Sequence, residues 1–500
     1  MNHETHRRSA SRSGLLGVPG LVGLGCLLGS VGVLSGCGGS SEISRTPTSA
    51  ALVAEGFKVD RAVAGRLSTL GVGEIFVPAG SFDAQGVFTP SRWPELPTGQ
   101  RVALWVQIQP PAAKPEAVAD QIAEVLRSRI LEAQSFGWTP GGVVLDLARQ
   151  APGVADLGAA FVTRARKQLG ESGWVGVAVP RDAAGPWSEV AKAAQLVIWD
   201  AYGQAAGEKV DNSAWDLLSV SPRFGPIASW GRPVMARVRT LASIERGGSG
   251  ESTTEVTLGA LARDRRLRLQ EGFALSGVDR VSYEWRSEDR LRVGSWDLVR
   301  GERLFFRGPR LASLEELARD LKPRPEFAGF VFDRIPQPTE AASMPIDSYG
   351  RILGSAGSAG SASSTAAGQL ALELTGVRSG RTGTVRIKLN NPTSFSSEIA
   401  MMGVNYVEIE VDGGFFGDVD AGFFYRYEYL RRGETRPSMA ALRRPERIRF
   451  YLPLLEAGES FGSGPIEVSF DGNGGGVKGV AEFMSQDGRP LRAPEARWTP

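Results

Sequence analysis

The sequence predicts an α/β protein: a (β/α)8 TIM-like barrel followed by an all-β sandwich. Short apolar runs alternate with amphipathic helical patterns across residues 50–340. Residues 369–490 instead alternate polar and apolar side chains between Gly, Asn, Pro and Asp turns, with almost no helical pattern. Residues 341–368, which lie between these two regions, are rich in Gly, Ser and Ala. A segment of that composition has little to bury, so it predicts a flexible linker between two folded domains.

Residues 1–37 are predicted to be a lipoprotein signal peptide. Three arginines precede an uncharged apolar segment at 14–34, which is the pattern of a secretory signal. The segment ends in Leu34-Ser35-Gly36-Cys37, which resembles a bacterial lipobox. That resemblance implies cleavage before Cys37 and its acylation, with palmitate among the chains, and hence a membrane anchor; the alternative is a plain secretory peptide. Gly38 follows Cys37, which favours an outer-membrane or periplasm-facing position over retention at the inner membrane.

The polar residues 38–49 are expected to be a tether, and the barrel strands follow it. Several of these strands are continuous Val, Ile and Leu runs, as expected where both faces of a parallel sheet are covered. The candidates are Ala50–Ala54, Glu74–Val77, Val102–Ile108, Val143–Leu147, Trp174–Val179, Leu196–Trp199, Val234–Val238, Arg280–Trp285 and Phe330–Phe332. A barrel needs eight strands, so one candidate is surplus. Either the first is extra, or residues 278–310 form an inserted hairpin.

Amphipathic helices are predicted between the strands. The best are Pro115–Gln134, Val154–Leu169, Leu258–Leu269 and Ser313–Leu321. No Gly-rich fingerprint opens any of them, which argues against a dinucleotide-binding fold. Eight or nine strand–helix pairs over about 290 residues favour the barrel over a doubly wound sheet.

The C-terminal domain is predicted as a β-sandwich followed by a tail at 491–500. Its expected strands are Val385–Leu389, Tyr406–Val411, Phe423–Tyr429, Arg447–Leu452 and Ile466–Phe470. Each alternates polar and apolar residues, which is the pattern of a half-buried strand.

Histidine and cysteine are confined to the N-terminal segment, at His3, His6, Cys26 and Cys37. The rest of the chain therefore has no Ser-His-Asp triad, Cys-His pair or His-ligated zinc site. The acidic, Gly-rich stretch at 411–422 is better explained by hairpin turns than by a calcium site. No metal and no cofactor is expected. The 57 basic and 55 acidic residues nearly balance, with no basic run among aromatics, so nucleic acid is not an expected partner.

Four predicted strands end in carboxylates: Asp146, Asp200, Glu284 and Asp333. Active sites of such barrels lie at the C-terminal ends of the strands, and glycoside hydrolysis needs two carboxylates, one as acid and one as base or nucleophile. The hypothesis makes Glu284 the acid/base and Asp200 or Asp146 the nucleophile or stabiliser. The sugar would lie against Tyr202, Trp199, Trp285 and Tyr283. Alternatively, these acids cap helices or pair with arginines such as Arg334, which adjoins Asp333.

Residues 141–148 (GGVVLDLA) resemble the fourth strand of chitinase-like barrels, whose motif runs Asp-Gly-x-Asp-x-Asp-x-Glu. Gly142 takes the Gly and Asp146 the last Asp, but Gly141 and Val144 replace the other aspartates. Ala148 stands where the acid Glu would be. The resemblance implies the fold and argues against that chemistry.

A broader resemblance joins the lipobox to four short segments. These segments, Phe76-Val77-Pro78, VLDLA, VAVP and IWDAYG, occur in an order that resembles an uncharacterised group of bacterial barrel lipoproteins, a family of unknown function. The resemblance brings no established activity.

Two functions therefore stay open from the sequence. One is a lipid-anchored envelope protein whose barrel binds or hydrolyses a glycan, such as a polysaccharide or peptidoglycan, through strand-end carboxylates. The other is a non-catalytic carbohydrate-binding or scaffold lipoprotein on a degenerate barrel. The missing Glu at Ala148 favours the second, and the oligomeric state does not follow from the sequence.

Overall fold

A computed structural model describes most of the chain beyond the leader. The described residues are 48–83, 85–108, 115–148, 155–170, 173–201, 221–270, 280–309, 311–337, 339–341, 344, 346–354, 369–393, 396–397, 405–456, 458–472, 474–485 and 490–500. The predicted signal peptide with Cys37, most of the tether and Tyr202 lie outside them. Among the described residues, no helix is long and apolar enough to cross a membrane.

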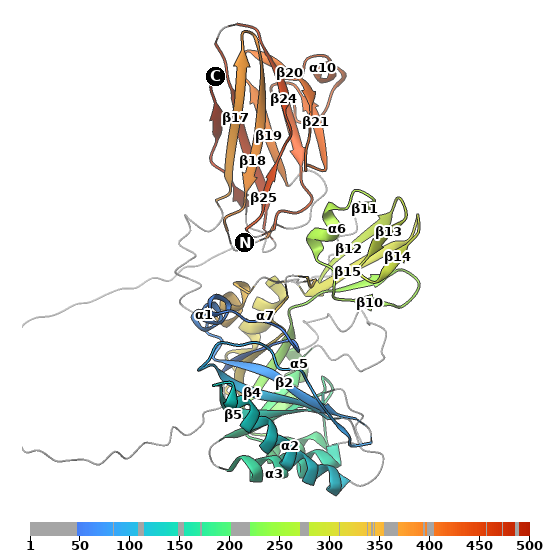
Figure 1. Cartoon of the computed structure of the whole chain (residues 1–500), viewed down its shortest axis with the longest axis vertical. Coiled ribbons are helices and arrows are strands. Elements are labelled where there is room, and N and C mark those ends of the chain that lie inside the picture. The colour runs from blue at the N-terminus through green and yellow to red at the C-terminus, as the bar shows by residue number, and fades with distance from the viewer. Residues whose placement is uncertain are drawn as a thin grey trace, which may run out of the picture. The chain divides into compact units, whose positions relative to one another are not determined.

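The predicted (β/α)8 barrel is confirmed (Figure 1). Neighbouring strands pair in parallel from β1 round to β16, and the sheet closes because β1 pairs with both β2 and β16. A short strand, β3 (Phe88–Pro90), pairs antiparallel with β2. The eight barrel strands are β1 (Ser49–Leu52), β2 (Glu74–Phe82), β4 (Arg101–Ile108), β5 (Thr139–Asp146), β6 (Trp174–Val179), β7 (Leu196–Asp200), β8 (Val234–Arg239) and β16 (Phe327–Asp333).

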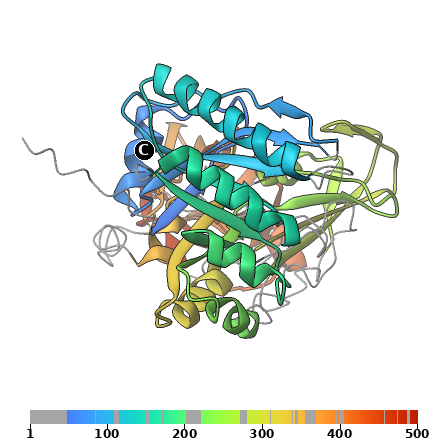
Figure 2. The same ribbon diagram turned by 90° about the horizontal axis from the view of Figure 1, so that it is seen from below.

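Helices cover the outer face of the barrel, where Val, Ile and Leu side chains of the strands meet the apolar faces of the helices. Figure 2 shows α2 and α3 lying side by side outside the strands that they connect. The barrel helices are α1 (Arg61–Thr69), α2 (Pro115–Ser135), α3 (Ala155–Leu169), α4 (Trp187–Ala193), α5 (Ser221–Ala228), α7 (Leu311–Leu321) and α8 (Ser348–Leu353).

Aromatic side chains from β2, β4 and β6 pack together in the barrel interior. The ring of Phe76 lies 5.8 Å from that of Trp105 and 6.0 Å from that of Trp174. Trp174 is fully buried and occupies the space beside Gly142, where a Cβ would overlap its indole ring. Gly142 therefore leaves room for the indole inside the barrel.

We expect Gly142→Ala to destabilise the protein by about 1–3 kcal/mol, because the methyl group overpacks the interior against Trp174. Thermal or urea unfolding checks the value. Gly225→Ala is the matched control, since a Cβ at this α5 position meets nothing within 4 Å and alanine favours the helix. Equal stability of the two variants would contradict the packing argument.

An antiparallel sheet is inserted between β8 and β16, in the order β10-β9-β15-β12-β11, with a separate β13-β14 hairpin. It explains the surplus strand: the expectation that Arg280–Trp285 is a barrel strand is wrong, because β12 pairs antiparallel with β11 and β15. The alternative of an insertion near 278–310 is correct. The elements are β9 (Ser243–Arg246), β10 (Ser252–Thr253), α6 (Leu258–Arg263), β11 (Leu267–Leu269), β12 (Arg280–Ser287), β13 (Leu291–Val293), β14 (Trp296–Leu298) and β15 (Arg303–Pro309).

The helix predicted over Leu258–Leu269 is also corrected, because α6 ends at Arg263 and Leu267–Leu269 forms β11. The side chain of Asp264 accepts a hydrogen bond from the backbone nitrogen of Arg266, 3.0 Å away. Such an Asx turn competes with helix continuation. The apolar spacing that suggested one long helix is shared between the helix and the strand.

Two antiparallel sheets form the C-terminal domain, and the predicted sandwich is confirmed by the single apolar core that both sheets share. One sheet holds β17, β18, β20, β23 and β24, and the other holds β19, β21, β22, β25, β26 and β27. The elements are β17 (Ala371–Ser379), β18 (Thr382–Asn390), β19 (Tyr406–Val411), β20 (Gly414–Val419), β21 (Arg426–Leu430), α10 (Met439–Arg443), β22 (Arg447–Tyr451), β23 (Ser460–Gly462), β24 (Ile466–Phe470), β25 (Val477–Met484), β26 (Pro490–Arg492) and β27 (Ala496–Trp498).

Candidate functional site

Three of the predicted carboxylates lie at one rim of the barrel. Asp146 is the last residue of β5, Asp200 of β7 and Asp333 of β16. The strands run in parallel, so their carboxyl ends meet at the same end of the barrel, where barrel enzymes and binding proteins hold their ligands. β7 and β16 flank β8 in the sheet, which places two of the acids beside the end of that strand.

Arg237 of β8 holds the three acids together. Its Nη2 lies 2.7 Å from Oδ2 of Asp333, and its Nε donates a hydrogen bond of 3.0 Å to the same oxygen. Its Nη1 lies 3.6 Å from Oδ2 of Asp146 and 3.9 Å from Oδ2 of Asp200. Only 5% of Arg237 is exposed, so its guanidinium forms these contacts in a buried position and not at the surface. We call these four residues the Arg237 cluster.

Trp105 of β4 completes the surroundings of the Arg237 cluster. Its Nε1 donates a 3.0 Å hydrogen bond to Oδ2 of Asp146, and its ring centroid lies 5.0 Å from Cζ of Arg237, a cation–π distance. The backbone nitrogen of Ala148 donates a 3.0 Å hydrogen bond to Oδ1 of Asp146. Both oxygens of Asp146 are therefore engaged by protein donors.

The electrostatics of the cluster favour its charged state. Burial alone would lower the pKa of Arg237, but the three aspartates reverse this and raise its pKa above the ordinary value. Burial alone would raise the pKa of Asp333, but the positive charge of Arg237, with smaller contributions from Arg239 and Arg334, holds that pKa below its ordinary value. Asp333 is thus an ionised group at neutral pH.

Glu284, the fourth acid, is not in the cluster. It lies on β12 of the inserted sheet, with Arg303 Nε 3.6 Å from its Oε1, and it is buried. The run VSYEW alternates apolar and polar residues, which is the pattern of an antiparallel strand rather than of a parallel barrel strand. Glu284, which the sequence favoured as the acid, therefore lies within an antiparallel strand of the inserted sheet and not at the end of a barrel strand.

The aromatic residues proposed to line a sugar subsite make core contacts. Trp199 is fully buried on the helix side of the barrel, its Nε1 donates a 3.1 Å hydrogen bond to the carbonyl of Arg181, and its ring lies 5.7 Å from that of Phe224. Tyr283 and Trp285 are buried in the apolar core of the inserted sheet. In this conformation none of these three rings offers an open face to a ligand.

Sequence reasoning missed Arg237 and Trp105. A signal for Arg237 was present, because it is the one charge inside the buried run Val234–Val238, and a buried charge has to be paired. Trp105 stood in an apolar strand and gave no sign of its polar contact. Among the described residues, no group of three His, Cys, Asp or Glu side chains is arranged to hold a metal ion.

The fold and the cluster define the chain as a (β/α)8-barrel protein with an inserted antiparallel sheet and a C-terminal sandwich. No protein-family model matches it, and no curated protein matches its sequence at a significant level. The chain does show structural similarity to solved proteins, among them a spore cortex-lytic enzyme and two chitinases. The spore cortex-lytic enzyme SleL of Bacillus megaterium is 12% identical, over 61% of this chain and 72% of that one, with a TM-score of 0.38.

Two chitinases are also among the similar structures. The chitinase of Chromobacterium violaceum is 14% identical, over 62% of this chain and 98% of that one, with a TM-score of 0.38. The GH18 chitinase of Cycas revoluta, in complex with (GlcNAc)4, is 11% identical, over 62% of this chain and 99% of that one, with a TM-score of 0.34. At these values the function has to be inferred from the chain's own residues.

Proposed function

We propose that this protein is a lipid-anchored component of the bacterial cell envelope that binds a glycan at the rim of its barrel without hydrolysing it. The observation that carries the proposal is the Arg237 cluster, in which one buried guanidinium pairs with all three strand-end aspartates. Membrane attachment rests on the lipobox-like sequence that ends at Cys37, because two or more acyl chains suffice for a stable anchor.

The cluster suits binding better than hydrolysis. A glycosidase needs a carboxylic acid that is protonated at working pH to donate to the leaving oxygen. The pKa of Asp333 is lowered, both oxygens of Asp146 accept hydrogen bonds from the protein, and Ala148 stands where the chitinase-like motif has its acid. If Asp200 were the nucleophile or base, none of these residues would therefore be left to donate the proton to the leaving oxygen.

A glycan is the ligand class that fits the rim and the sequence resemblance together. Carboxylates accept hydrogen bonds from sugar hydroxyls, and a guanidinium donates to their oxygens. The side chains of Asp200 and Asp333 keep 12% and 18% of their surface exposed, so they are the members of the Arg237 cluster that a ligand can reach most easily. The chitinase-like stretch at 141–148 points to the same ligand class.

We expect Asp200→Asn to weaken glycan binding by at least tenfold, because an acceptor for sugar hydroxyls becomes an amide. Asp200 is the aspartate farthest from Arg237, at 3.9 Å, so this change disturbs the cluster least. Residues 41–500 are titrated calorimetrically with (GlcNAc)4 and soluble peptidoglycan fragments, while chromatography measures product release.

Glu284→Gln is the matched control, since it changes a buried acid of the inserted sheet and should leave binding unchanged. If the wild-type chain releases product and either variant abolishes that release, the proposed function would change from binding to hydrolysis. If the Asp200→Asn chain binds the glycan with wild-type affinity, the proposal that the glycan binds at the barrel rim would be wrong.

A further inference from the structure

A cavity in the sandwich, separate from the barrel rim, is lined by charged side chains of both signs. Its volume is about 520 Å³, within the range of roughly 300–1,000 Å³ usual for ligand pockets. In its lining, Glu410 lies near the end of β19, Lys478 on β25 and Arg497 on β27, while Asp412 and Arg432 come from the adjoining turns. We call this the sandwich cavity.

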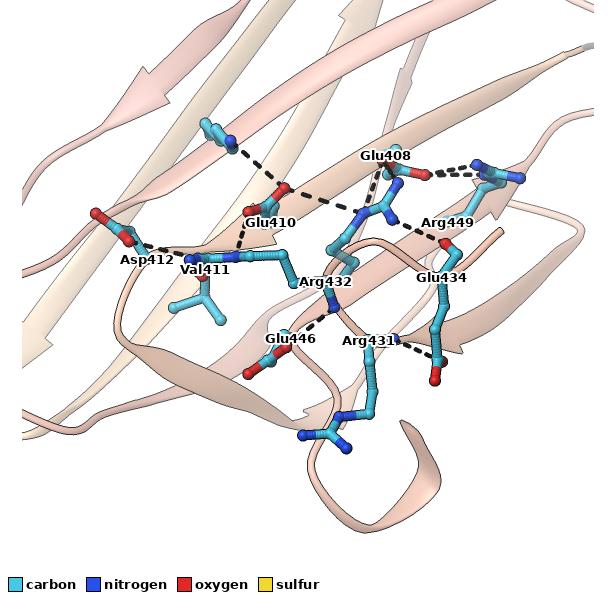
Figure 3. A network of polar contacts seen from close by, with 11 residues as sticks. Glu408, Glu410, Val411, Asp412, Arg431, Arg432, Glu434, Glu446 and Arg449 are labelled. Atoms are coloured by element: carbon cyan, nitrogen blue, oxygen red, sulfur yellow. Dashed lines mark hydrogen bonds and ion pairs between the residues drawn. The ribbon is translucent and has the colours of Figure 1, made fainter. Parts of the chain in front are cut away.

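The charged side chains of the sandwich cavity already form ion pairs, some of which Figure 3 shows. Arg432 lies between two acids, with its Nε 2.9 Å from Oε1 of Glu410 and its Nη2 3.4 Å from Oδ1 of Asp412. Lys478 Nζ lies 3.4 Å from Oε2 of Glu410. Arg497 donates a 2.6 Å hydrogen bond from Nε to Glu495. The lining therefore carries many charged hydrogen-bonding groups and little net charge.

Arg432 and Glu410 are held in place by further contacts. Arg432 donates from Nη2 to the carbonyl of Val411 at 3.2 Å, and its backbone nitrogen donates to Glu446 at 3.0 Å (Figure 3). Behind them, Glu408 accepts hydrogen bonds of 3.0 and 2.8 Å from Arg449 and also pairs with Arg447. Such a network fixes the side chains before a ligand arrives, which lowers the entropic cost of binding.

We propose that the sandwich cavity is a second ligand site, which binds a neutral saccharide. A simple anion would meet Glu410 and Asp412 there, and a simple cation would meet Arg432, Lys478 and Arg497. A zwitterion would have to displace the pairs that these groups form. Sugar hydroxyls add to remaining donors and lone pairs of both charge types without breaking those pairs. This site belongs to the sandwich and does not depend on ligand binding at the barrel.

The outer groups of the cavity are accessible and suit mutation. The side chains of Asp412 and Arg497 are 79% and 73% exposed, so their replacement by alanine should leave the fold intact. Arg436→Ala is the matched control, an exposed arginine of the same domain that does not line the cavity.

The experiment uses residues 41–500 carrying Asp200→Asn, so that the barrel rim is weakened. Cellotetraose and (GlcNAc)4 serve as neutral probes and alanyl-alanine as the zwitterionic probe, titrated calorimetrically. At least one tetrasaccharide should still bind, and Asp412→Ala/Arg497→Ala should weaken that binding at least tenfold, as should Lys478→Met. Arg436→Ala should change it less than twofold.

Binding that persists unchanged in both cavity variants would overturn the sandwich site and leave the barrel proposal standing. Binding that the cavity variants abolish and Asp200→Asn leaves untouched would support the sandwich site and overturn the barrel proposal. A cavity that takes only alanyl-alanine, or no probe at all, would also overturn the sandwich site.

Discussion

Arg237→Gln is expected to destabilise the barrel by about 3–5 kcal/mol at pH 7, the usual cost of removing one partner from a buried ion pair. Glutamine leaves Asp146, Asp200 and Asp333 close together without the charge that all three face. The change also removes the cation that lies over the ring of Trp105. The cluster is thus expected to be a structural requirement of the rim as well as its binding surface.

The effect of Arg237→Gln should depend on pH. The pKa of Asp333 is held low in the folded protein, so its ion pair contributes stability above the unfolded pKa of about 3.9 and loses it as the pH falls below that value. The stability gap between wild type and variant should therefore narrow as the pH falls below about 4.

Urea unfolding of the two chains at pH 7 and at pH 3, followed by tryptophan fluorescence, measures this gap. Arg223→Gln is the matched control, because it breaks an exposed ion pair with Asp182 and should cost less than about 1 kcal/mol. A cost of that size for Arg237→Gln as well would show that the cluster does not stabilise the barrel.

Glu74→Gln is expected to stabilise the protein by about 3 kcal/mol at pH 8. Glu74 begins β2 inside the barrel with a fully buried side chain. Burial raises its pKa to about 7, although Arg101, with Nε 3.6 Å from Oε1, acts in the opposite direction. Glutamine keeps the shape of the side chain and cannot ionise.

The sign follows from proton linkage. The unfolded chain releases the Glu74 proton near pH 4.5, whereas the folded chain keeps it until about pH 7. Wild-type stability should therefore fall as the pH rises between these values and level off above them, by about 1.4 kcal/mol for each unit between the two pKa values. The Glu74→Gln chain should lack this decline, and the two chains should be equally stable at pH 4.

Urea unfolding from pH 4 to pH 8 tests this prediction. Glu95→Gln is the matched control: its carboxylate also has one cation at 3.6 Å, Lys58, but the side chain is 68% exposed, so its variant should follow the wild-type profile. A Glu74→Gln chain that is less stable than wild type at pH 8 would mean that the ion pair with Arg101 outweighs the cost of burial.

The local pattern of the sequence was sufficient for most of the fold. Continuous apolar runs such as Trp174–Val179 predicted barrel strands, because a parallel strand is buried on both faces. Arg280–Trp285 was wrongly placed in the barrel, although its alternating polar and apolar residues are typical of an antiparallel strand. Strand β17 was missed because most of its side chains are exposed, which leaves little hydrophobic pattern.

The candidate site was predictable only in part. The strand-end rule brought Asp146, Asp200 and Asp333 together correctly, because parallel strands end at one rim. It could not identify their common partner, since Arg237 meets Asp200 and Asp333 on the two strands beside β8 and reaches Asp146 of β5 only in the closed barrel. The mixed charges of the sandwich cavity come from three strands and two turns and carry no sequence motif.

The sequence by itself determined the order of the two domains, the confinement of histidine and cysteine to the first 37 residues, and the acids at the strand ends. Those properties depend on composition and on short-range periodicity. Tertiary structure alone decided that the acids share one buried guanidinium, that Glu284 belongs to an inserted sheet, and that Glu74 is enclosed in the barrel. Burial and charge pairing depend on which distant segments of the chain contact one another, and the closure of the barrel sheet determines those contacts.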